Sequence, residues 1–319
     1  MNRRFALIQA LISLIALAAV VWWASKQEPP EIPTGGRALA YLGLALGLYS
    51  VATLLRGERW HRILEVTGVH AKRRDCYALT TVGYMGNNVL PARAGEALRV
   101  VLLSARCDAG KRTLAGSVVA ERLLDVIALV TIFVVVVYGA LSSAALPTDR
   151  PLLVTGVGAL LLLGGCVAVW VLRRHHALER ARDWLRPLAD APRSLLGRQG
   201  VLLLGATFVL WICEAAVYLA VARAVELDIS VSGALYLVAL TNFVAALPAA
   251  PGSIGTFDAA VAFGARRLGA SGSAALSYLL ILRFVLYVPI TVFGLVMLVT
   301  RYGGWSRLRS AARLEASRA

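Results

Sequence analysis

Long apolar stretches separated by short polar segments dominate this sequence from end to end. A helix needs about 20 consecutive apolar residues to cross a bilayer, and six stretches come close to or reach that length. They predict transmembrane helices near 5–24, 38–55, 113–138, 151–172, 199–222 and 274–300. Two further apolar regions, 76–104 and 232–264, are interrupted by proline, glycine and polar residues. The pattern therefore predicts an all-α polytopic membrane protein.

The positive charge of the connecting segments predicts the orientation. Lys and Arg are concentrated in 56–75, in 173–198 and in the tail 301–319, whereas 25–37 and 139–150 carry few. Basic segments stay on the cytoplasmic side. We therefore expect a multi-pass protein of the bacterial cytoplasmic (inner) membrane with both termini, including the short basic tail, in the cytoplasm.

This orientation decides how the two interrupted regions run. Region 76–104 lies between two cytoplasmic segments, and region 232–264 lies between two outer ones. Each is too short for two ordinary spans, so we expect two re-entrant helical hairpins that enter from opposite faces. Both contain Asn, then Leu-Pro-Ala, then Gly and a carboxylate, as an inverted repeat would. The chain 1–319 is thus expected to form one integral membrane domain.

Composition agrees with this interpretation. Hydrophobic residues make up 59% of the chain and the mean hydropathy is +0.71, above the soluble average. The net charge of +15 falls between spans, which indicates contact with anionic lipid rather than nucleic acid. The four cysteines are scattered, and no cofactor or metal site is predicted.

Apolar residues also recur at helical spacing inside two of the basic segments. Trp60, Ile63 and Leu64 share one face, and so do Leu178 and Trp184. Arginines flank both sets, which favours short helices in the headgroup layer. A solvated basic loop is the alternative.

The first interrupted region holds the first cluster of candidate residues, in the sequence NNVLPARAGEALR. Pro91 fits the first turn of a helix running from Arg93 to Ser104. The positive end of that helix and the Arg93 guanidinium would together bind a phosphate. The candidates here are Asn88, Arg93, Glu96 and Arg99. The alternative is an ion-pair network that closes a hairpin tip.

A second cluster lies in the first turns of the span 113–138. Glu121, Arg122 and Asp125 place three charges within five residues, and charges at membrane depth need partners. Arg93 and Arg99 are the expected partners. A headgroup-level cluster beside Lys111 and Arg112 is the alternative.

A third cluster lies at the tip of the second interrupted region, in the sequence LPAAPGSIGTFD. Glycines let backbone approach closely, and Ser253 or Thr256 is expected to cap the next helix. A glycine-rich helix start would form an anion cradle, and a tight turn packed on a neighbour is the alternative. The candidates are Pro251, Gly252, Ser253, Gly255 and Asp258.

Two single charges complete the predicted site. Glu214 and Arg283 lie in the middle of spans, and pairing of Arg283 with Glu214 or with Asp258 would keep them charged. The candidate groups then contain four arginines against five carboxylates. This near balance suits a polar cavity with a surplus acid that could bind a proton or cation.

In this order, these stretches resemble the lysylphosphatidylglycerol synthase transmembrane region, also called the flippase-like family. The matching residues are Asn88 to Arg99, Glu121 to Asp125, Glu214, Leu247 to Gly255, and Arg283. Ser253 and Asp258 stand where that family often has Gly and Glu. The resemblance covers nearly the whole chain.

The resemblance implies a membrane part that moves aminoacylated phosphatidylglycerol across the bilayer. The tail after Thr300 is too short for the aminoacyl-transferase part of multidomain members, so lysyl transfer is not carried over. Stand-alone relatives are linked to glycolipid, polyprenyl-phosphate or hopanoid pathways, which leaves the cargo open.

The sequence therefore predicts a non-enzymatic lipid translocase for an anionic or phosphate-containing headgroup. An integral membrane transferase acting on lipid-linked substrate is an alternative, although no Asp-x-Asp pair or long loop supports it. A non-transporting partner subunit of such an enzyme, or a homo-oligomer, also remains open.

Overall fold

The computed structural model describes residues 3–30, 33–90, 93–139, 191–246 and 250–303, and these ranges are helical, without strands. The helices in chain order are α1 (Arg3–Ala24), α2 (Gly36–Val66), α3 (Arg73–Val89), α4 (Gly95–Ser104), α5 (Lys111–Gly139), α8 (Arg198–Ala224), α9 (Val231–Ala246), the 3₁₀ turn η4 (Pro251–Ser253), α10 (Thr256–Arg267) and α11 (Gly272–Tyr302). The expected α-helical fold is confirmed for these residues. The predicted span 151–172 and the residues around Leu178 and Trp184 lie outside the described ranges.

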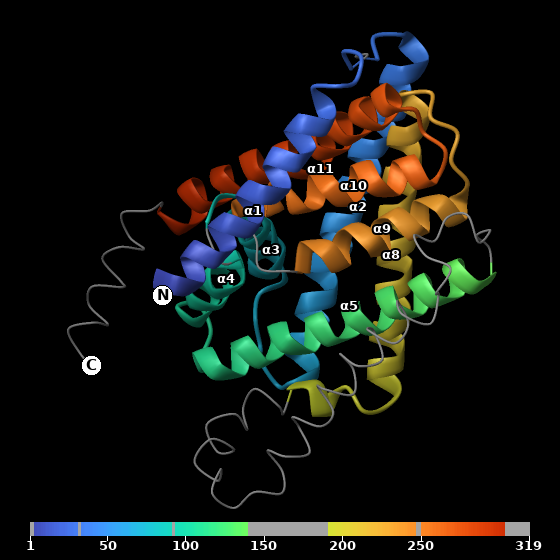
Figure 1. The fold of residues 1–319 in the computed structure, drawn as a ribbon. Coiled ribbons are helices and arrows are strands. Elements are labelled where there is room, and N and C mark those ends of the chain that lie inside the picture. Colours follow the sequence, from blue (N-terminus) through green and yellow to red (C-terminus); the bar gives the residue numbers. More distant parts are fainter. Residues whose placement is uncertain (1–2, 31–32, 91–92, 140–190, 247–249, 304–319) are drawn as a thin grey trace, which may run out of the picture.

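The long helices α2 and α8 pack side by side, α5, α9 and α11 pack obliquely against one or both of them, and α10 packs on α9 and α11 (Figure 1). A large hydrophobic core joins these six helices, with Tyr218, Tyr236 and Tyr278 among its fully buried side chains. Exposed Leu, Val and Phe residues line the outward faces of α2, α8 and α11. Burial on one face and apolar exposure on the other is what a lipid-facing helix requires.

Three described helices, α2, α8 and α11, are long and apolar enough to cross a membrane. They correspond to the predicted spans 38–55, 199–222 and 274–300. Helix α1 matches the predicted span 5–24 in its bounds, and α5 matches 113–138. In α5 the charges near its start interrupt the apolar run.

Helix α2 runs further than the sequence pattern predicted. We expected a loop to begin at Arg56, but the helix continues to Val66 and ends where Gly68 adopts a φ of 77°. Glycine tolerates this left-handed conformation, and no proline stops the helix earlier. Trp60, Ile63 and Leu64 belong to this long helix and are fully buried in protein, so the prediction of a separate short helix whose apolar face contacts the headgroups is wrong.

Each interrupted region forms two helices that pack against each other. Helix α3 packs on α4, and α9 packs on α10. Both first helices end just before a Leu-Pro pair, at Val89 and at Ala246. A residue before proline is driven out of the helical conformation, and Leu90 has an extended ψ of 147°.

The open ends of these two hairpins lie at opposite ends of α11, which is 31 residues, or about 46 Å, long. At its carboxyl end, Arg106 donates to the Arg301 carbonyl at 2.6 Å and the Tyr302 hydroxyl donates to Asp75 at 3.2 Å. At its amino end, α11 starts at Gly272, only a few residues after α10 ends at Arg267, and Leu268, just after α10, packs on Gly233 at the start of α9. The first hairpin therefore opens toward one end of α11 and the second toward the other.

Candidate functional site

The tips of the two hairpins meet beside α11. The Asn88 side chain donates to the Thr291 hydroxyl of α11 at 2.8 Å. The Arg93 guanidinium donates to the Ala245 carbonyl of the second hairpin at 2.6 Å. Gly252 lies so close to the Asn88 carbonyl that an added Cβ would sit 3.3 Å from that oxygen. Residues from sequence regions about 150 positions apart thus form one junction.

A cavity of about 120 Å³ lies at this junction. Both tips contribute to its wall, and so do α2, α8 and α11. Of the predicted site residues, it brings together Asn88, Arg93, Glu214, Gly252 and Ser253. The remaining lining residues are Tyr49, Tyr84, Asn87, Tyr218, Thr241, Asn242, Ala245, Phe257, Leu286 and Tyr287.

Arg93 reaches the cavity from a strained turn rather than from a helix. We expected it in the first turn of a helix, but α4 begins only at Gly95, and Arg93 has a φ of 52°. The close packing of Gly95 on α3, where an added Cβ would lie 1.9 Å from the Gly83 carbonyl, fixes the start of α4. The Ala245 carbonyl is among the last of α9, so Arg93 lies at the negative end of that helix.

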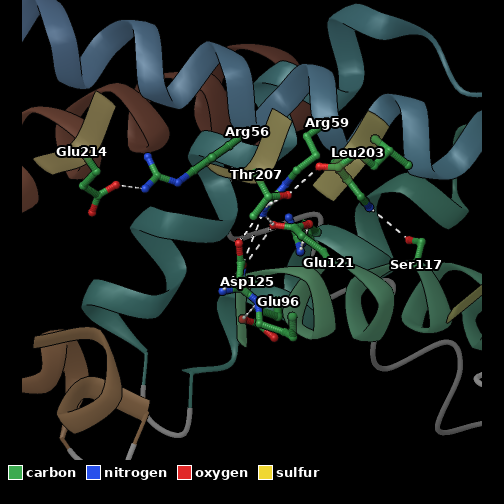
Figure 2. A network of polar contacts seen from close by, with 12 residues as sticks. Arg56, Arg59, Glu96, Ser117, Glu121, Asp125, Leu203, Thr207 and Glu214 are labelled. Atoms are coloured by element: carbon green, nitrogen blue, oxygen red, sulfur yellow. Dashed lines mark hydrogen bonds and ion pairs between the residues drawn. The ribbon is translucent and has the colours of Figure 1, made fainter. Parts of the chain in front are cut away.

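The predicted charges of α5 are joined in a buried network (Figure 2). Glu121, fully buried, pairs with Arg99 at 2.8 Å and with Arg59 at 3.2 Å. Arg59 also donates to Asp125 at 2.6 Å and to Thr207 of α8 at 3.1 Å.

Arg122 completes this network on the side of the first hairpin. It pairs with Glu96, Glu121 and Asp125, each at 3.2 Å. The prediction that the α5 charges pair with the first tip is confirmed for Glu121, through Arg99, and for Arg122, through Glu96. Asp125 pairs instead with Arg59 and Arg122. Arg93 contributes instead to the cavity.

Glu214 finds its partner in Arg56 rather than in Arg283. The two side chains form a buried ion pair between α2 and α8, at the left of Figure 2. The Arg56 guanidinium lies 5.3 Å from the Tyr84 ring centroid and 5.7 Å from that of Trp211.

Arg283 pairs with Asp258, which is one of its two expected partners. Arg283 binds Asp258 at 2.5 Å and the Gly252 carbonyl at 2.9 Å. The other Asp258 oxygen accepts the Gly255 amide at 2.8 Å, so Asp258, rather than Ser253 or Thr256, caps α10. Gly255 also packs on α1, where an added Cβ would meet Ser13 and Leu17 at 2.6 Å. These contacts are those of a tight turn packed on a neighbour.

The charge balance differs from the one the sequence predicted. With Arg56 and Arg59 included, six arginines face five carboxylates among the described residues of these clusters. Five arginines pair with carboxylates, whereas the partner of Arg93 is a backbone carbonyl. The expected surplus acid is therefore replaced by a surplus arginine, and that arginine lines the cavity.

Arg56 and Arg59 are the members of these charged clusters that sequence reasoning missed, because they were assigned to a cytoplasmic loop. A signal was present: Ala45, Tyr49, Ala52, Arg56 and Arg59 recur every three or four residues. All five are buried on one side of α2. Helical periodicity that continues through arginines marks them as inward-facing.

Within the described ranges, no three His, Cys, Asp or Glu side chains are grouped in a way that could hold a metal ion.

The protein-family model of the lysylphosphatidylglycerol synthase TM region matches residues 7–294 of this chain. A UPF0104 membrane protein of Methanothermobacter thermautotrophicus is 25% identical over 90% of this chain and 93% of its own length. Glycosyltransferase AglD of Haloferax volcanii is 28% identical over 53% of this chain and 26% of its own length. No solved structure matches.

Proposed function

Because this membrane protein belongs to the lysylphosphatidylglycerol synthase transmembrane-region family, we propose that it translocates a lipid with an anionic headgroup across the membrane. The observation that carries the proposal is the position of Arg93. It is the arginine of the six that lacks a carboxylate partner among the described residues, and it lines the cavity where the two hairpin tips meet. A guanidinium in that position suits a phosphate group.

The arrangement of the hairpins supports a route for the headgroup. We propose that they are re-entrant, enter from opposite membrane faces, and form an inverted repeat. Non-helical backbone at membrane depth is tolerated where it is buried in protein or lines a wet cavity. The described residues Arg93 and Ser253, one from each tip, line the cavity, which supports this proposal. Movement of one hairpin against the other would then expose the cavity to each side in turn.

A transferase remains the second candidate because one relative is named a glycosyltransferase. The similarity covers about a quarter of that protein, so it does not assign a glycosyl-transfer reaction to this chain. A partner subunit that presents lipid-linked substrate to an enzyme would use the same cavity without moving the lipid.

Reconstitution into liposomes with fluorescently labelled anionic phospholipids separates these functions. Translocation predicts label reaching the opposite leaflet without covalent change, which a membrane-impermeant quencher measures. A transferase predicts a modified lipid, detected by mass spectrometry. A partner subunit predicts neither result.

Variants of Arg93 test the role of the cavity. Arg93→Lys keeps the charge but loses the planar fork, so transport should fall, and Arg93→Ala should lower it by about tenfold to a hundredfold. The helix-end contact of Arg93 contributes only about 0.3–1 kcal/mol of stability, so both variants should fold. Arg223→Lys and Arg223→Ala, at an exposed arginine paired with Asp228, are the matched controls. Full transport by folded Arg93→Ala would exclude Arg93 as the headgroup ligand.

A further inference from the structure

The second hairpin tip is held by two helices through contacts of different strength. From α11, Arg283 pairs with Asp258 and donates to the Gly252 carbonyl. From α1, the Ser13 hydroxyl accepts a hydrogen bond from the Ala250 amide at 2.6 Å. Hydrogen bonds that involve an ionised group are stronger than those between neutral groups. The contact with α1 is therefore the weaker of the two.

Helix α1 is itself loosely attached to the rest of the described structure. It packs on α10 (Figure 1), and of its described side chains, at residues 11 and 13–24, Ser13 alone is buried. Leu14 and Trp22 are each 64% exposed, and Trp23 packs partly on the large core. A segment with few buried contacts separates at low cost. Helix α1 can therefore leave the second tip while the core stays folded.

The backbone of the second tip is strained in the conformation that α1 holds. Ser253 has a φ of 49°, and this left-handed conformation is unfavourable for a residue with a Cβ. Such strain persists only where the surrounding structure maintains it. The Ser253 amide donates to the Ala250 carbonyl at 2.9 Å, so the residue that Ser13 binds also closes this turn. Loss of the α1 contact should let the turn relax.

The strained turn faces the cavity between the hairpin tips, whereas Ser13 does not. Gly252 and Ser253 line the cavity, and Ser13 is not one of the described residues in its wall. The contact between Ser13 and the tip runs through the backbone of Ala250. A change at α1 therefore reaches the cavity wall through the tip, which makes Ser13 a positioning residue.

We infer that α1 is a strap on the second hairpin tip, with Ser13 as the residue that positions the tip. While Ser13 holds Ala250, the tip closes the cavity wall. When α1 moves away, the turn relaxes and the cavity opens sideways toward lipid. A lipid needs a side opening because its tails stay in hydrocarbon while its headgroup enters. This inference rests on the proposed function, since it assigns the moving part of the same route.

A reversible disulfide between α1 and the tip tests whether the two must separate. Ser13→Cys and Ala250→Cys are combined in a full-length protein whose native cysteines are replaced by alanine, in liposomes with a fluorescently labelled anionic phospholipid. Oxidation should form the cross-link and abolish transport, and reduction should restore it. Each single-cysteine variant is a matched control and should transport equally after both treatments. A pair that does not cross-link, or full transport by the cross-linked protein, would overturn the inference.

A distance measurement isolates the role of Ser13 without relying on transport. Spin labels at the exposed positions Leu14 of α1 and Val209 of α8 report the separation of these helices by pulsed EPR. In Ser13→Ala, the population with α1 displaced should increase about fivefold, as the loss of one hydrogen bond implies. Ser25→Ala removes an exposed bond to the Trp22 carbonyl and should leave the distances unchanged. An unchanged distribution in Ser13→Ala would exclude the positioning role.

The two measurements keep this inference separate from the proposed function. If α1 is displaced in Ser13→Ala but no lipid crosses the bilayer with any variant, the strap stands and translocation fails. If the cross-linked protein moves lipid at the full rate, translocation stands and the strap fails.

Discussion

At the scale of single residues, Glu121 shows how a carboxylate is kept charged in a fully buried position. Three arginines from three different helices, Arg59, Arg99 and Arg122, surround it. Arg99 is held in turn against Trp60, with its guanidinium 4.6 Å from the ring centroid. Because an unpaired buried charge is far more costly than a paired one, these residues depend on one another.

Glu121→Gln should therefore destabilise the protein strongly. Removing one partner from a buried ion pair costs about 3–5 kcal/mol, since the remaining charges stay buried. Thermal unfolding in detergent should show a clear decrease in the midpoint. Asp228→Asn, which removes an exposed carboxylate paired with Arg223, should change it little. A Glu121→Gln protein as stable as the wild type would contradict the importance of the network.

At the scale of elements, small residues let the first hairpin close. Gly83 and Gly86 of α3 face Gly95 at the start of α4, and α11 packs on α3 through Gly294. An added Cβ at Gly294 would lie 2.5 Å from the Thr81 carbonyl. Small residues at helix interfaces are the usual means of close packing in membranes. The position of the Arg93 turn therefore depends on glycines that carry no chemistry themselves.

Gly95→Ala should displace α4 from α3 and disturb the Arg93 turn. The new methyl group would overlap the Gly83 carbonyl, and overpacking of this kind costs about 1–3 kcal/mol. We expect a lower unfolding midpoint together with reduced transport. Gly43→Ala in α2, where an added Cβ meets nothing within 4 Å, is the matched control and should be neutral or slightly stabilising. Unchanged stability and transport in Gly95→Ala would argue against the tightness of this contact.

At the scale of the whole molecule, α11 connects the two hairpins. Its carboxyl end is joined to the first hairpin through Asp75 and Arg106, and its middle is joined to the first tip through Thr291. Arg283, about two helical turns before Thr291 on α11, donates to the Gly252 carbonyl of the second tip. A single continuous helix thus contacts both tips, and any movement of one hairpin against the other must occur along it.

Cysteine labelling tests the proposed opposite entry of the hairpins. Single cysteines at the exposed positions Lys72 and Ala105 should react from the cytoplasmic side, and those at Ser230 and Arg266 from the outside. The native cysteines are replaced by alanine, and a membrane-impermeant maleimide is applied to each side in turn. Labelling of Lys72→Cys and Ala105→Cys from opposite sides would end the inverted-repeat model.

The sequence by itself determined the helical membrane class, both helix breaks and most of the charged residues of the site. These features depend on local rules: apolar length, the restriction that proline places on the residue before it, and the cost of a charge within an apolar run. It also limited the partners of Arg283 to two residues, of which Asp258 is the observed one.

Only the tertiary structure decided which charges neutralise one another. Arg56 and Arg59 belong to α2, although the basic residues after position 55 predicted that this helix ends before them. Their partners Glu214 and Asp125 lie far away in sequence. Arg93 was expected on a helix, but the packing of Gly95 against α3 moved the helix start beyond it. Pairing between charges depends on distances across the fold, which periodicity along one chain cannot supply. For that reason the sequence predicted a surplus acid in the cavity, whereas the structure places a surplus arginine, Arg93, there.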